Sequence, residues 1–228
     1  MFTLSQVVPW GRSFDEYQRM FALTAGDLER RIVCFADGPA AFNAEATRRG
    51  HRVVSCDPLY QFGRLDIRER IDATYDEVLA QTRANADEFV WSDELPDAES
   101  LGRVRMAAMR SFLDDYEAGQ AAGRYLDAAL PVLPFEDQSF DLALCSHFLF
   151  LYSTQLGEPF HLAAPREMCR VAKELRVFPL LALGGERSPF VDTCTRALVA
   201  AGLEVSIERV PYEFQRHANE MMRVSWPT

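Results

Sequence analysis

The chain has 228 residues, 48% of them hydrophobic and 25% charged, with a formal net charge of −10. This apolar fraction excludes a disordered chain. The length fits one sizeable domain or one domain with a small cap, and we take residues 1–228 as a single domain. Lys173 is the only lysine, and no run of basic residues forms a tail or a membrane-binding segment. Nucleic acids and anionic membranes are bound through dense Lys/Arg surfaces, so we expect neither as a partner.

The sequence carries no sign of export. Its first residues, MFTLSQVVPWGRSFDEY, lack a basic start followed by an apolar stretch, so we expect no signal peptide. The longest apolar run, residues 148–152, is far shorter than a membrane span. The five cysteines are odd in number and never spaced as CxxC, which favours reduced thiols in a cytoplasmic protein. Without CxxC or HxxxH pairs, we expect no metal site.

The first quarter of the chain predicts a helix followed by a strand–helix–strand unit. Ser13 and Glu16 have the spacing of a capping box, which marks a helix start. Residues 31–36 (RIVCFA) form a short apolar run, residues 40–49 are rich in alanine, and residues 52–56 (RVVSC) form a second apolar run. The last three segments together have the size of a βαβ crossover.

Two long mixed-charge segments follow, at residues 64–90 and 98–120, and both have helical periodicity. The residues expected on their apolar faces are Ile67, Ile71, Val78 and Leu79 in the first and Val104, Met106, Met109 and Leu113 in the second. This stretch is longer than a crossover requires. We interpret residues 64–123 as a helical insertion within the domain, which could be a lid over a pocket or an outer helical layer without a gating role.

The second half alternates between strands and helices. Expected strands cover residues 125–133 (one short strand), 140–146, 175–183 (interrupted by Pro179), 203–210 and 221–226, and expected helices cover residues 167–172 and 190–201. This alternation predicts an α/β fold, a three-layer Rossmann-like sandwich with a mostly parallel sheet and a C-terminal antiparallel strand pair. Open sheets of this kind bind ligands beyond the carboxyl ends of their strands.

The first two expected strands end in residues that suit a nucleoside ligand. Gly38 follows the first strand within CFADGPAAF, where glycine permits an unusual backbone angle and a close approach of a ligand. Asp57 ends the second strand, where a carboxylate can accept hydrogen bonds from two ribose hydroxyls. Each residue alone also fits an ordinary turn, but their order and spacing together favour a nucleoside-containing ligand.

The segments RIVCFADGPAAF, RVVSCDPLY, LPFEDQSFDLALCSHFLF and the closing strand pair carry a resemblance to a known family. Together they resemble the class I S-adenosylmethionine-dependent methyltransferases, most of all bacterial enzymes that act on small molecules. LPFEDQSFDLAL is the most specific piece, because it is similar to a run that precedes strand four in these enzymes. The resemblance covers most of the chain from Arg31 onward, apart from the helical insertion. It implies S-adenosylmethionine as cofactor and a small-molecule acceptor.

The resemblance also implies roles for particular residues. Residues just after strand four line the junction of donor and acceptor, so His147 and Ser146 become the candidate catalytic residues. His147 can deprotonate or orient an acceptor hydroxyl, amine or thiol. The candidate cofactor-binding residues are Ala36, Asp37 and Gly38 beside the donor, Asp57 at the ribose, Arg12 and Tyr17 at the methionyl carboxylate, and Ser146.

The chain departs from the family pattern in two places. The family loop is usually G-x-G-x-G, whereas Ala36 and Ala40 stand on either side of Gly38 here. The family's carboxylate near the adenine would fall on Ala129, with Asp127 close by. These departures leave open a cofactor-binding regulatory protein, or an inactive homologue without methyl transfer.

Other interpretations stay open as well. His147 can instead cap its strand or bond a buried carbonyl, and Trp10 and Phe14 can form a hydrophobic staple rather than cover the donor. His161 and His217 are weaker catalytic candidates. A nucleotide-dependent oxidoreductase on a similar sheet is a third functional hypothesis. The apolar closing strands are compatible with a monomer or a homodimer.

Overall fold

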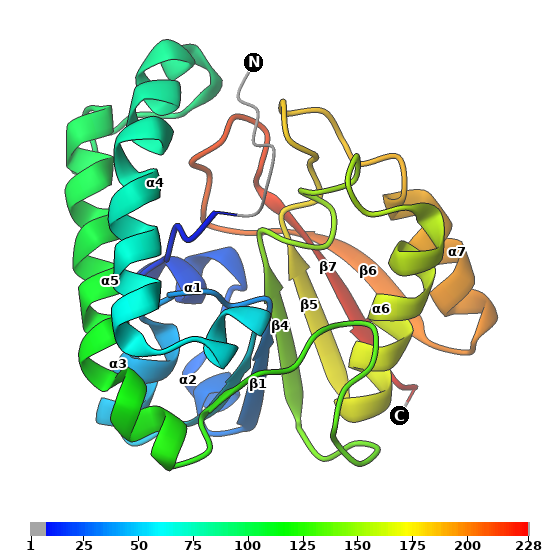
Figure 1. Ribbon diagram of the computed structural model, residues 1–228. Helices are drawn as coiled ribbons and strands as arrows, with labels where there is room; N and C mark the ends of the chain where they lie inside the picture. The colour runs from blue at the N-terminus through cyan, green and yellow to red at the C-terminus, as the bar shows by residue number, and fades with distance from the viewer. Residues whose placement is uncertain (1–7, 228) are drawn as a thin grey trace.

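The computed structural model describes residues 8–227, which form a seven-stranded sheet with helices on both faces (Figure 1). The expectation of no signal peptide rests in part on residues 1–7, which lie outside the described residues. The strands are β1 Arg31–Phe35, β2 Arg52–Cys56, β3 Tyr125–Leu126, β4 Leu142–Ser146, β5 Glu174–Phe178, β6 Glu204–Arg209 and β7 Glu220–Ser225. Their spatial order is β3-β2-β1-β4-β5-β7-β6. Strand β7 runs antiparallel to β5 and β6, and the other pairs are parallel, which confirms the predicted fold class.

The helices divide between the two faces of the sheet. The α-helices are α1 Phe14–Met20, α2 Ala25–Leu28, α3 Phe42–Arg48, α4 Arg64–Ala84, α5 Ala98–Ala121, α6 Glu158–Val171 and α7 Val191–Ala200, and the short 3₁₀ helices are η1 Pro58–Gln61 and η2 Ala86–Glu88. Helices α1 to α5 lie on one side of the sheet, and α6 and α7 cover the other (Figure 1). The predicted three layers are therefore present.

Local sequence signals account for most element boundaries. Ser13 caps α1, because its hydroxyl accepts a hydrogen bond from the Glu16 backbone while the Glu16 carboxylate accepts one from the Ser13 backbone. Strand β4 (LALCS) is buried along its whole length, as expected of a central strand covered on both faces. Strand β5 ends at Phe178, immediately before Pro179, since proline has no N–H for the ladder.

Several boundaries differ from the predictions. Helix α4 ends at Ala84 rather than at residue 90, and η2 follows it. Helix α6 begins at Glu158, well before the predicted residue 167, with Pro159 in its first turn. Val104 is 38% exposed, so its assignment to the apolar face of α5 was wrong. The buried face of that helix instead runs through Leu101, Arg105, Ala108, Met109 and Phe112.

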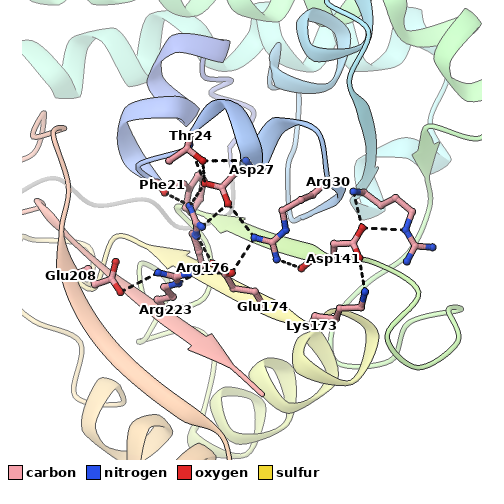
Figure 2. Close-up of polar contacts among 11 residues, drawn as sticks. Phe21, Thr24, Asp27, Arg30, Asp141, Lys173, Glu174, Arg176, Glu208 and Arg223 are labelled. Atoms are coloured by element: carbon pink, nitrogen blue, oxygen red, sulfur yellow. Dashed lines mark hydrogen bonds and ion pairs between the residues drawn. The ribbon is translucent and has the colours of Figure 1, made fainter. Parts of the chain in front are cut away.

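A cluster of ion pairs joins neighbouring elements at the end of the sheet where the parallel strands begin (Figure 2). Arg176 in β5 is 4% exposed, and its guanidinium pairs with Asp27 at 2.9 Å and with Glu174 at 2.7 Å. Glu174 also pairs with Arg30 at 3.0 Å and with Arg223 of β7 at 2.9 Å. Two carboxylates thus serve three arginines near the amino ends of the strands. This pairing allows an arginine in a strand that the sequence reads as apolar.

Several polar contacts fasten the helical insertion to the rest of the chain, among them the following two. Arg105 of α5 is 1% exposed and forms an ion pair with Glu16 of α1. Beyond α4, the backbone N–H of Val90 donates to the carbonyl of Phe214 at 2.7 Å, in the connection between β6 and β7. The insertion is therefore tied to both the N-terminal helix and the C-terminal hairpin.

Candidate functional site

A cavity of about 690 Å³ lies at the carboxyl ends of the parallel strands. Its wall includes the residues that follow β1, β2, β3 and β4, in the segments 35–40, 56–59, 128–130 and 146–148. The chain ahead of α1, residues 8–12, forms another part of the wall. Its volume is within the range of about 300–1,000 Å³ that is typical of small-molecule sites.

The loop after β1 has two residues in the left-handed backbone conformation, one of which is an alanine. Ala36 has φ +51° and Gly38 has φ +52°, so an alanine adopts the left-handed conformation at the first position. A side chain added at Gly38 would meet no atom within 4 Å, which leaves open space against this backbone. The loop can therefore bring its main chain close to a ligand.

Asp37 lies at the base of this loop and is 6% exposed. Its carboxylate accepts a hydrogen bond from the hydroxyl of Ser55 at 2.6 Å and another from the hydroxyl of Tyr17. Burial raises the pKa of Asp37 to about 6, and the charge of Asp57 adds to this effect, although the two hydrogen bonds act in the opposite direction. The carboxyl group therefore changes charge near neutral pH.

Asp57 lies between the loops that follow β1 and β2. One carboxylate oxygen accepts a hydrogen bond from the backbone N–H of Gly38 at 2.9 Å, and the other accepts one from the N–H of Leu59 at 2.8 Å. Burial raises the pKa of Asp57 from its ordinary value, against the effect of these two hydrogen bonds. Each oxygen keeps a second lone pair, so the group can still accept hydrogen bonds from a ligand.

The segment after β3 contributes no carboxylate to the cavity. Ala128, Ala129 and Leu130 line it, whereas Asp127 is exposed and does not. The cavity wall at this position therefore consists of apolar residues.

Ser146 and His147 end β4 at the cavity. The Ser146 hydroxyl lies 2.9 Å from Nδ1 of His147, and the backbone N–H of His147 donates to the carbonyl of Phe178 at 2.7 Å. His147 has φ +49°, a strained conformation of the kind that clusters at functional sites. Desolvation and the charges of Arg12 and Arg105 hold the pKa of His147 well below its ordinary range. Its imidazole is therefore neutral at physiological pH.

The N-terminal segment adds positive charge to the cavity wall. Arg12 donates a hydrogen bond to the carbonyl of Trp10 at 2.8 Å, and its buried Nε has no partner within residues 8–227. Glu16, whose charge acts on Arg12, is paired with Arg105 and accepts a hydrogen bond from Tyr212 at 2.9 Å. Against desolvation, the charge of Arg105 lowers the pKa of Glu16 to about 2. Two arginines thus share one carboxylate, which leaves positive charge available for an anionic ligand group.

The ring of Trp10 contacts the helical insertion. Its centroid is 5.9 Å from that of Tyr75 in α4, whereas Phe14 stacks on Phe42 at 5.3 Å. The ring contacts of Trp10 and Phe14 therefore go to different partners, and no ring pair joins the two residues within the described chain. This pattern does not match the staple that the sequence left open.

The predicted site residues lie together in the wall of the cavity. All eight line it, namely Arg12, Tyr17, Ala36, Asp37, Gly38, Asp57, Ser146 and His147. The hydroxyl of Tyr17 donates a hydrogen bond to Asp37. This contact favours a role for Tyr17 in positioning that carboxylate rather than in direct contact with a ligand. Of the weaker candidates, His161 is fully buried outside the cavity lining, and His217 is exposed.

Sequence reasoning missed the parts of the wall that come from distant segments. Arg105, Phe89, Phe214 and Gln215 all line the cavity. One sequence signal could have identified Arg105. It lies four residues after Leu101 and therefore on the buried face of α5, where a charged residue is unusual. The other three lie in loops whose placement depends on contacts far along the sequence.

Within residues 8–227, no three His, Cys, Asp or Glu side chains gather in a way that could hold a metal ion, and no helix has the length and apolarity needed to cross a membrane.

One relative is similar over nearly the whole chain. The uncharacterized protein MJ0045 of Methanocaldococcus jannaschii is 31% identical over 220 residues, which cover 96% of both chains. No protein-family model matches the sequence.

Solved structures with a similar arrangement are far more distant in sequence. Magnesium protoporphyrin IX methyltransferase of Synechocystis PCC 6803, with bound S-adenosylhomocysteine, is 11% identical with a TM-score of 0.47, covering 89% of this chain and 76% of its own. A S-adenosylmethionine-dependent methyltransferase of Aquifex aeolicus is 13% identical with a TM-score of 0.40, covering 86% and 80%. Likeness at this level concerns the fold alone.

Proposed function

We propose that this chain, which belongs to the same family as the uncharacterized protein MJ0045 of Methanocaldococcus jannaschii, transfers a methyl group from S-adenosylmethionine to a small-molecule acceptor. One observation carries the proposal. A single cavity at the strand tips holds the backbone of the loop after β1, the carboxylate of Asp57 and the neutral imidazole of His147. These are the groups needed to bind a nucleoside beside a general base.

The residues present fit the methyl donor. Open space against Gly38 admits a ligand to the loop backbone, and the free lone pairs of Asp57 suit two ribose hydroxyls. The excess positive charge at Arg12 suits the methionyl carboxylate. Asp37, ionised above a pKa of about 6, would face the positive groups of the donor, and Tyr17 and Ser55 would hold it in place.

S-adenosylmethionine would supply a methyl group on a positively charged sulfur, open to in-line attack by a nucleophile. The chain's contribution is chiefly to position that nucleophile, which is the largest source of rate in such a transfer. If Nδ1 of His147 donates to the Ser146 hydroxyl, the lone pair of Nε2 is free, and Nε2 has no protein partner within residues 8–227. His147 would then take the proton of an acceptor hydroxyl, amine or thiol as that atom bonds to the methyl carbon, while the bond from carbon to sulfur breaks and leaves the sulfur uncharged, as in S-adenosylhomocysteine.

The cavity walls support a small acceptor. Helices α4 and α5 close one side, and Arg105–Glu16 and the Val90–Phe214 contact fix them there. We therefore propose that the helical insertion is a fixed wall rather than a swinging lid. A net charge of −10 also disfavours a nucleic-acid acceptor.

Calorimetry with S-adenosylhomocysteine and S-adenosylmethionine tests the cofactor. We expect one site per chain, and no heat at millimolar ligand would refute the cofactor assignment. Mass spectrometry of small molecules retained by the purified protein addresses the acceptor, and a retained nicotinamide cofactor would favour an oxidoreductase instead.

A second candidate is a cofactor-binding regulatory protein without turnover. The observations in its favour are alanine at positions 36 and 40 of the loop and the absence of a carboxylate from the cavity wall after β3. Cofactor binding without methylation of any molecule in a cell extract, followed with a labelled methyl group, would favour this candidate.

A further inference from the structure

The connection between β6 and β7 brings Gln215 to the cavity wall. Gln215 is half-buried, and its amide atoms remain accessible to the cavity rather than sealed in protein. The amide makes no hydrogen bond with residues 8–227. An amide at a cavity wall that no protein group engages is available to a ligand.

The backbone around Gln215 is held firmly. Val90 donates to the carbonyl of Phe214 at 2.7 Å, and Arg216 donates to the carbonyl of Glu88 at 2.9 Å. Phe89 and Gln215 form an antiparallel bridge between these two bonds. The loop is thus paired like a short strand with the segment after α4, and the amide is presented from a fixed backbone.

The surroundings of the amide are apolar. Phe89 and Phe214 stack with centroids 4.8 Å apart, and both line the cavity, as does Leu183. On the other side, a side chain added at Gly185 would lie 3.7 Å from Nε2 of Gln215. None of these groups is charged. Arg70 and Glu88 also line the cavity, but each of them already has a partner. A ligand that filled this end would remove water from the amide.

A glutamine amide offers one acceptor and two donors. A carboxylate would use only the donors and an ammonium only the acceptor, and each would leave half of the amide unpaired in apolar surroundings. A neutral edge that carries a donor beside an acceptor pairs with both. This holds for either orientation of the amide.

We infer that Gln215 determines acceptor specificity, and that the acceptor is an uncharged, largely apolar molecule with an amide-like or lactam-like edge. The inference rests on the proposed function, since it assigns this end of the cavity to the acceptor. It places the recognised edge at Gln215 and leaves the nucleophile of the acceptor to His147.

Calorimetry on the full chain saturated with S-adenosylhomocysteine tests the inference with three flat probes. The lactam 2-quinolone is compared with 2-methylquinoline, which lacks the edge, and with quinoline-2-carboxylate, which carries a charge. We expect 2-quinolone to bind about tenfold or more tightly than either. In Gln215→Leu the difference should shrink to about threefold or less, because the unpaired amide is gone.

Two further variants complete the design. Gln215→Met keeps a side chain of similar length but has no amide, so it should also lose the preference for the lactam. Gln18→Leu, at a half-buried glutamine of α1 outside the cavity wall, should keep the wild-type preference. Equal affinities for the three probes, or a preference that survives Gln215→Leu, would overturn the inference while leaving the cofactor assignment standing. Failure of S-adenosylhomocysteine itself to bind would overturn both.

Discussion

The carboxylate of Asp57 and the backbone N–H of Gly38 are joined by a hydrogen bond of 2.9 Å, which ties the end of β2 to the loop after β1. The second carboxylate oxygen holds the N–H of Leu59 at 2.8 Å. One side chain therefore shapes both loops that border the cavity and still has lone pairs for a ligand. Loss of its charge would therefore affect both the conformation of the two loops and the binding of a ligand.

Asp57→Asn should weaken binding of S-adenosylhomocysteine. An asparagine keeps one acceptor oxygen but loses the charge, and hydrogen bonds to charged groups are worth about 1.5–3 kcal/mol, so we expect affinity to fall roughly 10- to 100-fold. Calorimetry measures the change. Asp127→Asn is the matched control, because this carboxylate lies nearby but outside the cavity lining, and it should change affinity by about twofold at most. Normal binding by Asp57→Asn would show that the ribose lies elsewhere.

Affinity for S-adenosylmethionine should rise with pH because of Asp37. Its pKa of about 6 in the free protein means that the carboxyl is mostly neutral below that pH and ionised above it. A bound cation favours the ionised form, so affinity should increase by up to about tenfold between roughly pH 5 and 7, with release of a proton. Calorimetry in buffers of different ionisation enthalpy measures both quantities.

Asp37→Asn should flatten this dependence, whereas Asp66→Asn, at an exposed carboxylate of the same cavity, should keep it. The free energy of unfolding should depend on pH in the opposite direction to the affinity. The folded state holds the Asp37 proton more tightly than the unfolded chain, so this group makes the protein less stable as pH rises from about 4 to 6. An unchanged pH profile in Asp37→Asn would show that another group carries the effect.

The sequence predicted the order of the strands and helices because their signals are local. The capping box of Ser13 and the apolar run of β4 identify their elements without any knowledge of distant contacts. The carboxyl ends of parallel strands meet at one edge, so Gly38, Asp57 and His147 could be assigned to a common site before their distances were known.

Other parts of the site depend on long-range pairing that no local pattern reveals. Arg105 and Arg176 lie where helix and strand patterns call for apolar residues, and each is tolerated because a distant carboxylate neutralises it. Gln215 belongs to a loop with no periodicity. It reaches the cavity only because the loop pairs with the segment after α4.

Gly11→Ala should disturb the site through the backbone. A side-chain carbon at Gly11 would lie 2.1 Å from the carbonyl oxygen of Pro39, so residues 8–12 and the loop after β1 would have to separate. Overpacking of this kind costs about 1–3 kcal/mol. We expect a lower melting temperature and weaker binding of S-adenosylhomocysteine, since Arg12 moves with the segment.

Gly26→Ala in α2 is the control for that change. The nearest atom to an added carbon there is the hydroxyl oxygen of Thr24 at 3.7 Å, an ordinary contact. Alanine should be neutral or stabilise the helix by up to about 1 kcal/mol. A melting temperature of Gly11→Ala equal to that of the wild type would mean that the segment packs less closely on Pro39.

His161→Phe should stabilise the protein without affecting ligand binding. The buried Nε2 of His161 has no hydrogen-bond partner within residues 8–227, and an unsatisfied buried group costs about 1–3 kcal/mol. Its Nδ1 lies 3.0 Å from the carbonyl oxygen of Gly157, but that oxygen also accepts the backbone N–H of Phe160 at 3.1 Å. The substitution therefore removes one orphaned nitrogen and creates no new unpaired group. The aromatic ring of Phe190, 4.2 Å away, suits a phenyl neighbour.

Urea unfolding of the wild type, His161→Phe and His161→Ala separates the polar effect from packing. We expect a gain of about 1 kcal/mol for phenylalanine and a loss of about 3 kcal/mol for alanine, which leaves a cavity. S-adenosylhomocysteine should bind all three alike, because His161 is not part of the cavity wall. A loss of stability in His161→Phe would indicate that a buried water satisfies Nε2, and a loss of ligand binding would make His161 part of the site after all.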